Sequence, residues 1–118
     1  MLPNDSTTAQ GTIDNHLNAF FQKNIDGVVA DYAPDAVLFV RDGQLHGVSA
    51  IRGFFANFMA TLPAGFLEAF KLHRKDVVGD VGYIVWEAAP WVQLGTDTFV
   101  VRDRKIVMQT FASHPASW

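Results

Sequence analysis

A single carboxylate among apolar residues is the strongest chemical signal in this sequence. Asp97 lies in the run GTDTFVVR, and because successive side chains of a strand alternate between faces, it shares a face with Phe99 and Val101. A buried carboxylate must be neutralised, hydrogen-bonded or put to use, and apolar surroundings raise its pKa toward the range suited to proton transfer. Asp97 is therefore our candidate general acid or base. Two other roles stay open for it, a pocket-lining group without chemistry and a purely structural acceptor of hydrogen bonds.

His16 is the second candidate for a polar group in a pocket. Ile13, Leu17 and Phe20 recur at helical spacing and form one apolar stripe, and His16 lies at its edge, one turn before Phe20. Its ring can therefore point inward. The alternative is a half-exposed histidine without a partner.

Trp86 and Glu87 are the next residues to consider, since neighbours in a strand face opposite ways and one of them must point inward. We favour Trp86, which would form a wall of the pocket. An inward Glu87 would instead bring a second carboxylate to Asp97 and raise its pKa further.

Other catalytic signatures are missing from the sequence. His46, His73 and His114 are scattered, no pair has the spacing of a zinc-binding helix, and the chain contains no cysteine. No phosphate-binding or dinucleotide-binding loop occurs. We therefore expect neither a metal nor a cofactor.

Composition limits the class of protein. The 118 residues fit one domain, of which 49% are hydrophobic and 18% charged. A net charge of −3 without a Lys/Arg run argues against nucleic acid, and no apolar run approaches the roughly 20 residues that span a membrane. The lack of cysteine is compatible with a reducing compartment, so we expect a cytoplasmic protein. Ten phenylalanines exceed what a small core needs and suggest a lined cavity or a subunit interface.

Periodicity predicts helices first and strands afterwards. A polar, flexible N-terminal arm over residues 1–11 precedes a single domain over residues 12–118. The short connections between the later strands require antiparallel pairing, which gives the α+β class. The expected helices are 12–24, 25–32 and 48–62, and the expected strands are 36–41, 66–78, 81–89, 91–103 and 105–113.

Three strings in this order resemble the nuclear transport factor 2-like superfamily, which includes SnoaL-like polyketide cyclases and ketosteroid isomerase. They are DGVVADYAPDAVLF at 26–39, GVSAIRGFF at 47–55 and TDTFVVRDRKIVMQTF at 96–111. The resemblance implies a cystatin-like α+β roll, in which a cone-shaped, curved antiparallel sheet wraps around three N-terminal helices and encloses an apolar pocket. It also implies a homodimer through the outer face of the sheet.

The resemblance also assigns site residues. Asp97 takes the position of the acidic hydrogen-bond donor of ketosteroid isomerase, and His16 takes that of its tyrosine donor. Val40 stands where that family has its proton-abstracting aspartate, and valine cannot accept a proton. Steroid-type isomerisation by that route is therefore not expected, unless Asp42, one pleat further along, replaces the base. SnoaL-like cyclases similarly depend on an acid/base carboxylate in the pocket, and Asp97 fits that role.

Two functional hypotheses follow. In the first, Asp97 assisted by His16 performs cofactor-free chemistry of the cyclase, isomerase or hydratase type on a small hydrophobic ligand. In the second, the same fold is a non-catalytic ligand-binding or dimerisation module. A third class, a protein-interaction module, would have a large exposed apolar patch outside the cone and a closed interior. Besides Asp97 and His16, the expected pocket-lining residues are Phe20, Val40, Phe54, Phe58, Trp86, Phe99 and Gln109.

Overall fold

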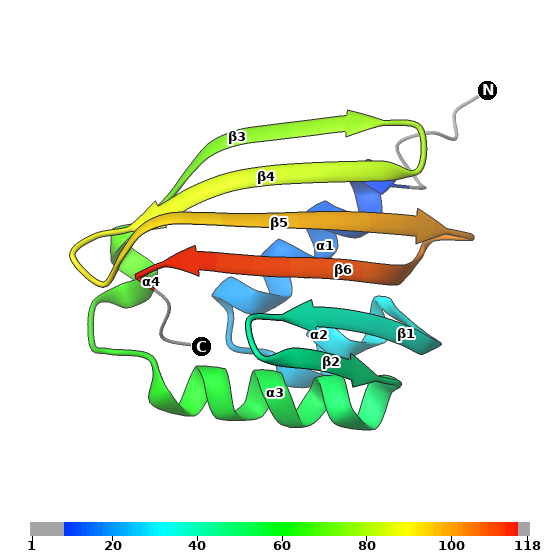
Figure 1. The fold of residues 1–118 in the computed structure, drawn as a ribbon, viewed down its shortest axis with the longest axis horizontal. Helices are drawn as coiled ribbons and strands as arrows, with labels where there is room; N and C mark the ends of the chain where they lie inside the picture. The colour runs from blue at the N-terminus through cyan, green and yellow to red at the C-terminus, as the bar shows by residue number, and fades with distance from the viewer. Residues whose placement is uncertain (1–8, 116–118) are drawn as a thin grey trace.

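Six strands form one curved sheet, and the helices cover one of its faces in the computed structural model, which describes residues 9–115 (Figure 1). The strand order is β2-β1-β6-β5-β4-β3. The helices are α1 (Gly11–Phe21), α2 (Ile25–Ala30), α3 (Val48–Thr61) and α4 (Phe66–Ala69). The strands are β1 (Tyr32–Val40), β2 (Gly43–His46), β3 (Phe70–Val78), β4 (Val81–Ala88), β5 (Val92–Arg102) and β6 (Lys105–His114). This is the expected α+β architecture of a curved sheet around N-terminal helices.

Apolar stripes attach the helices to the sheet. In α1, Ile13 and Phe20 are buried, and His16 is buried between them on the same side of the helix. The Asn24 side chain accepts a hydrogen bond from the backbone N–H of Gly27 and caps the start of α2. In α3, the buried stripe consists of Ile51, Phe55, Phe58 and Met59.

The long central strands alternate between buried and partly exposed side chains, as the period of two predicts. In β5, Asp97, Phe99 and Val101 are all buried. A two-residue turn joins β5 to β6, and both of its residues, Asp103 and Arg104, have positive φ angles of 51° and 64°. This geometry matches the twist of the flanking strands and brings β6 back directly beside β5.

Several local expectations were wrong. Tyr32 begins β1 instead of ending the second helix, and it lies opposite Ile106 of β6. Phe66–Ala69 forms a helical turn, because Gly65 adopts φ +89° and redirects the chain before β3. The short strand β2 was not expected, since its mostly exposed residues carry no alternating pattern.

The sheet also differs in one pairing. The β1·β6 pair is parallel, whereas the other pairs are antiparallel. The meander of β3 to β6 ends beside the early strand β1 and runs in the same direction. The sheet is therefore mixed, which the short connections of the later strands could not indicate.

The N-terminal arm expected over residues 1–11 falls largely outside the described residues, as does the end of the domain at 116–118. Within the described part, Ala9 is fully buried in the core and α1 already begins at Gly11. No helix among residues 9–115 is long and apolar enough to cross a membrane.

Gly95 allows the Trp86 side chain to lie directly on the neighbouring strand. Trp86 of β4 is paired with Gly95 of β5 in the register of the sheet. A Cβ atom at Gly95 would come within 2.2 Å of Cε2 of the indole, which is far inside van der Waals contact. Glycine at this position therefore determines where the indole lies.

The substitution Gly95→Ala should lower the free energy of unfolding by about 1–3 kcal/mol, because the added methyl group overpacks the buried indole. Gly43→Ala is the matched control, since a Cβ atom at Gly43 meets nothing within 4 Å. Its effect should stay within about 0.5 kcal/mol. Urea unfolding of both variants measures the difference, and equal losses would contradict this account.

Candidate functional site

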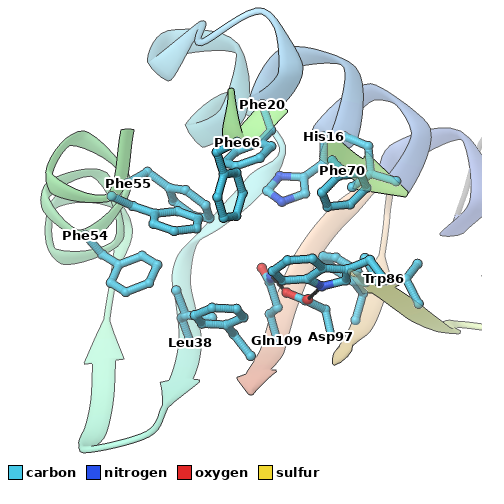
Figure 2. A pocket seen from close by; sticks show the side chains of 15 residues that line it. His16, Phe20, Leu38, Phe54, Phe55, Phe66, Phe70, Trp86, Asp97 and Gln109 are labelled. Atoms are coloured by element: carbon cyan, nitrogen blue, oxygen red, sulfur yellow. Dashed lines mark hydrogen bonds between the residues drawn. The ribbon is translucent and has the colours of Figure 1, made fainter. Parts of the chain in front are cut away.

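A cavity of about 50 Å³ lies between the helices and the inner face of the sheet (Figure 2). A single water needs only about 10–15 Å³ of such space, so the cavity has room for several waters or one small ligand. Twelve of its fifteen lining residues are apolar. The lining residues are His16, Leu17, Phe20, Leu38, Phe54, Phe55, Phe58, Phe66, Phe70, Ile84, Trp86, Asp97, Phe99, Gln109 and Phe111.

The Asp97 carboxylate is held at the wall of this cavity by two side-chain donors. Its Oδ1 accepts a hydrogen bond of 2.9 Å from Nε1 of Trp86, and its Oδ2 accepts one of 2.9 Å from Nε2 of Gln109. Figure 2 shows the carboxylate between these two side chains, which come from the strands on either side of β5. Each oxygen therefore has one fixed neighbour.

Tyr32 determines the orientation of the Gln109 side chain. Its hydroxyl donates to Oε1 of Gln109, so the amide group of Gln109 must point toward Asp97. The three residues form a buried chain of hydrogen bonds that reaches from β1 through β6 to β5. The sequence alone does not indicate this role of Tyr32, because the partner of its hydroxyl lies 77 positions away.

Burial raises the pKa of Asp97 to about 6, and the hydrogen bonds from Trp86 and Gln109 offset only part of this shift. A carboxyl group with this pKa exists in both protonation states near neutral pH. It can therefore accept and return a proton with little energetic cost. This is the property that a general acid or base requires.

His16 reaches the same cavity from α1 and is surrounded by aromatic rings (Figure 2). Its ring makes edge contacts with Tyr32, Phe55 and Phe99 at centroid distances of 5.5, 5.7 and 5.5 Å. Burial lowers its pKa to about 4, and contact with the backbone of Val28 opposes this shift only in part. The imidazole is therefore neutral at physiological pH, and its Nδ1 has no hydrogen-bond partner.

His16 and Asp97 share the cavity without forming a dyad. The side-chain hydrogen bonds of Asp97 go to Trp86 and Gln109, and no hydrogen bond among residues 9–115 joins Asp97 to His16. The two residues lie on different sides of the cavity (Figure 2).

The structure places most of the predicted pocket residues around this cavity. Trp86 points inward, whereas Glu87 points away and lies 2.6 Å from Nε2 of His73. Asp42 is exposed beside Arg41 and does not replace a base in the cavity. The predicted residues that line the cavity besides His16 and Asp97 are Phe20, Phe54, Phe58, Trp86, Phe99 and Gln109.

Val40 does not line the cavity, contrary to the expectation from the resemblance. It packs against the edge of the core and lies opposite Gly43, next to the turn that ends β1. Leu38, two residues earlier on the same face, lines the cavity instead. Val40 therefore lies beyond the cavity, at the end of β1.

Seven residues that line the cavity were not predicted from the sequence. Phe111 could have been found, because it shares its strand face with Gln109 and lies opposite Asp97 in the hairpin. Phe66 and Phe70 could not, since their approach depends on the helical turn of α4. The others are Leu17, Leu38, Phe55 and Ile84. Among residues 9–115, no group of three His, Asp or Glu side chains could hold a metal ion.

Asp97 and His16 make stability depend on pH in opposite directions. The raised pKa of Asp97 means that folding favours its protonated form, so stability decreases by about 3 kcal/mol as pH rises from about 4 to 6. The lowered pKa of His16 means that folding favours its neutral form, so stability decreases by about 3 kcal/mol as pH falls from 6.5 to about 4. The two trends oppose each other in the intact protein.

Compared with the unaltered protein, each substitution should therefore isolate the trend of the residue that it removes. Relative to the unaltered protein, Asp97→Asn should lose stability as pH falls from 6.5 to 4, and His16→Gln should gain it. Urea unfolding at several pH values measures both, and the comparison with the unaltered protein cancels the other titrating groups. Parallel pH profiles in the two variants would show that the groups are not buried as described.

Solved structures share this fold along most of the chain. A protein of Kribbella flavida aligns with a TM-score of 0.77 at 18% identity, covering 92% of this chain and 88% of that one. A putative polyketide cyclase of Sinorhizobium meliloti aligns with a TM-score of 0.73 at 17% identity, covering 86% and 94%. A SnoaL-like protein of unknown function from Burkholderia thailandensis aligns with a TM-score of 0.74 at 16% identity, covering 95% and 98%.

At these identities the solved structures are similar to this chain in fold alone. No curated protein matches the chain in sequence. The SnoaL-like domain model matches residues 13–109, which include every residue that we place in the candidate site except Phe111. The chain therefore belongs to the SnoaL-like family.

Proposed function

We propose that this protein is a cofactor-free acid/base enzyme that acts on a small, largely apolar molecule in the cavity. The observation that carries the proposal is the Asp97 carboxyl group, buried at the cavity wall with a pKa of about 6. The similarity in fold to the putative polyketide cyclase of Sinorhizobium meliloti supports chemistry of the cyclase type. Isomerisation and hydration use the same proton transfers and belong to the same proposal.

Asp97 takes a proton from the substrate and returns it at another position. Trp86 and Gln109 hold the carboxylate at the cavity wall, which removes the cost of orienting it during the reaction. A substrate that fills the cavity displaces its water, and the aromatic wall then keeps electrostatic interactions strong. Neutral His16, which lines the same cavity, offers a hydrogen bond to a polar group of the substrate.

Exchange of carbon-bound hydrogen with solvent deuterium tests this function without knowledge of the natural substrate. We expect the protein to accelerate exchange next to the carbonyl group of small cyclic ketones, observed by NMR in deuterium oxide. The rate should rise with pH through about 6 as Asp97 ionises. Asp97→Asn should slow the exchange by about 10²–10⁴-fold, because a general base contributes that much, and should keep most of the binding.

Glu87→Gln is the matched control, since Glu87 is a carboxylate on the opposite face of the same sheet and does not line the cavity. It should leave the exchange rate unchanged. Ketone binding without exchange would overturn the catalytic role and favour the second hypothesis, a non-catalytic ligand-binding module. Absence of binding for every ketone would overturn both.

We further propose a homodimer through the outer face of the sheet. A row of apolar side chains crosses five strands there, in register from one strand to the next. Three of its members are strongly exposed, Val78 at 79%, Val81 at 44% and Met108 at 40%. Contiguous exposed apolar surface of this kind is typical of an interaction site. The complete row is Val37, Met108, Val100, Val81 and Val78.

Met108→Glu should dissociate this dimer, because a two-fold axis would bring the introduced charge close to its own copy or bury it against apolar surface. The molecular mass measured by light scattering after size exclusion should then be 13.0 kDa, the mass of one chain, whereas the unaltered protein should show twice that mass. Asn57→Glu, on the exposed side of α3, should remain dimeric. A monomeric unaltered protein would contradict the proposal.

A further inference from the structure

The cavity contains one ionised group and no positive charge. Asp97 and His16 are its only lining residues that can carry a charge, and His16 is neutral at physiological pH. No lysine or arginine lines the cavity. Among the described residues, Arg41, Arg52, Arg74 and Lys75 form ion pairs with aspartates outside it.

Asp97 therefore lacks a counter-ion. At neutral pH, Asp97 is ionised in most molecules of the protein. The contacts that stabilise its charge come from two neutral donors, Trp86 and Gln109. Buried charges in proteins are normally paired, because two neutral hydrogen bonds do not replace the lost hydration of an anion. A positive charge placed in the cavity would supply the missing partner.

The wall of the cavity suits a cation as well. Eight phenylalanines and Trp86 line it, and the faces of aromatic rings carry negative electrostatic potential. The ring of Phe55 lies 5.7 Å from that of His16 between centroids, and Phe66 lines the same cavity (Figure 2). Attraction to such ring faces is strongest when the cation has lost its water, as it would here.

The polar groups of the cavity offer acceptors to a ligand. Nε1 of Trp86 and Nε2 of Gln109 already donate to Asp97, and the hydroxyl of Tyr32 already donates to Gln109. The carboxylate of Asp97 accepts from only one donor on each oxygen, although each oxygen can accept two hydrogen bonds. A ligand that brings several N–H donors would satisfy the free acceptor positions of this carboxylate.

We propose that the cavity binds a small primary amine in its protonated form, with the ammonium group beside Asp97 and a compact apolar body against the aromatic rings. This inference rests on the proposed function, because it names the class of molecule that the same cavity admits. A carboxylate or phosphate ligand is disfavoured, since it would meet a like charge and no cationic side chain. Neutral molecules of the same shape remain weaker ligands.

Three probes of matched shape test the charge preference: cyclopentylammonium, cyclopentanol and cyclopentanecarboxylate. Binding is measured by calorimetry at pH 7.5 and checked by tryptophan fluorescence, to which Trp86 in the cavity wall contributes beside the two other tryptophans of the chain. We expect the ammonium probe to bind at least about tenfold more tightly than the alcohol, as one desolvated cation–π and charge contact allows. The carboxylate should bind more weakly than the alcohol.

Two variants separate the local charge from the general charge of the protein. Asp97→Asn should abolish the preference for ammonium over alcohol while the alcohol still binds, which also shows that the cavity has kept its shape. Glu87→Gln removes an equal charge from the outer face and should leave the preference intact. A similar loss in both variants would overturn the proposal, because the preference would then arise from overall charge.

The outcomes also separate this inference from the proposed function. If the unaltered protein binds cyclopentanol as tightly as cyclopentylammonium or more tightly, the proposed preference for amines is wrong. The proposed acid/base enzyme would then act on neutral substrates. Failure of all three probes to bind would overturn the amine together with the ligand cavity on which the proposed function depends. Preferential ammonium binding without deuterium exchange would support the amine and overturn catalysis.

Discussion

The pair of hydrogen bonds from Trp86 and Gln109 to Asp97 is the interaction on which the rest of the site depends. It ties three adjacent strands together through their side chains and keeps a carboxylate inside an apolar enclosure. The same bonds oppose the rise in the pKa of Asp97 without cancelling it. Burial of a charge that is only partly compensated lowers the stability of the folded protein. The same burial shifts the pKa of the group toward values suited to proton transfer.

The sheet and the helices together enclose the Asp97 carboxylate. The curved sheet supplies Asp97, Trp86 and Gln109 from neighbouring strands, and the helices cover them with aromatic side chains (Figure 1). Gly95 lets the indole lie flat enough to reach the carboxylate, because any side chain at that position would occupy the same space. The absence of a side chain at Gly95 therefore affects Asp97 through one intermediate residue, Trp86.

The fold itself does not determine the chemistry. A de novo designed protein with a curved β-sheet aligns with this chain at a TM-score of 0.73 over 97% of its length, at 15% identity. The groups of this chain that could take part in chemistry are the polar side chains at the cavity, namely Asp97, His16 and Gln109, with the hydroxyl of Tyr32 behind them. Function must therefore be argued from these residues and their partners.

Hydrophobic period and short-range turn chemistry suffice to predict the α+β class, the amphipathic helices and the inward face of β5 with Asp97. The assembled sheet establishes what Asp97 contacts, since Trp86 comes from one neighbouring strand and Gln109 from the other. It also decided that Tyr32 fixes Gln109, that Val40 lies beyond the cavity and that β1 pairs parallel to β6. These features depend on sheet order and register between distant segments, which no local pattern of residues encodes.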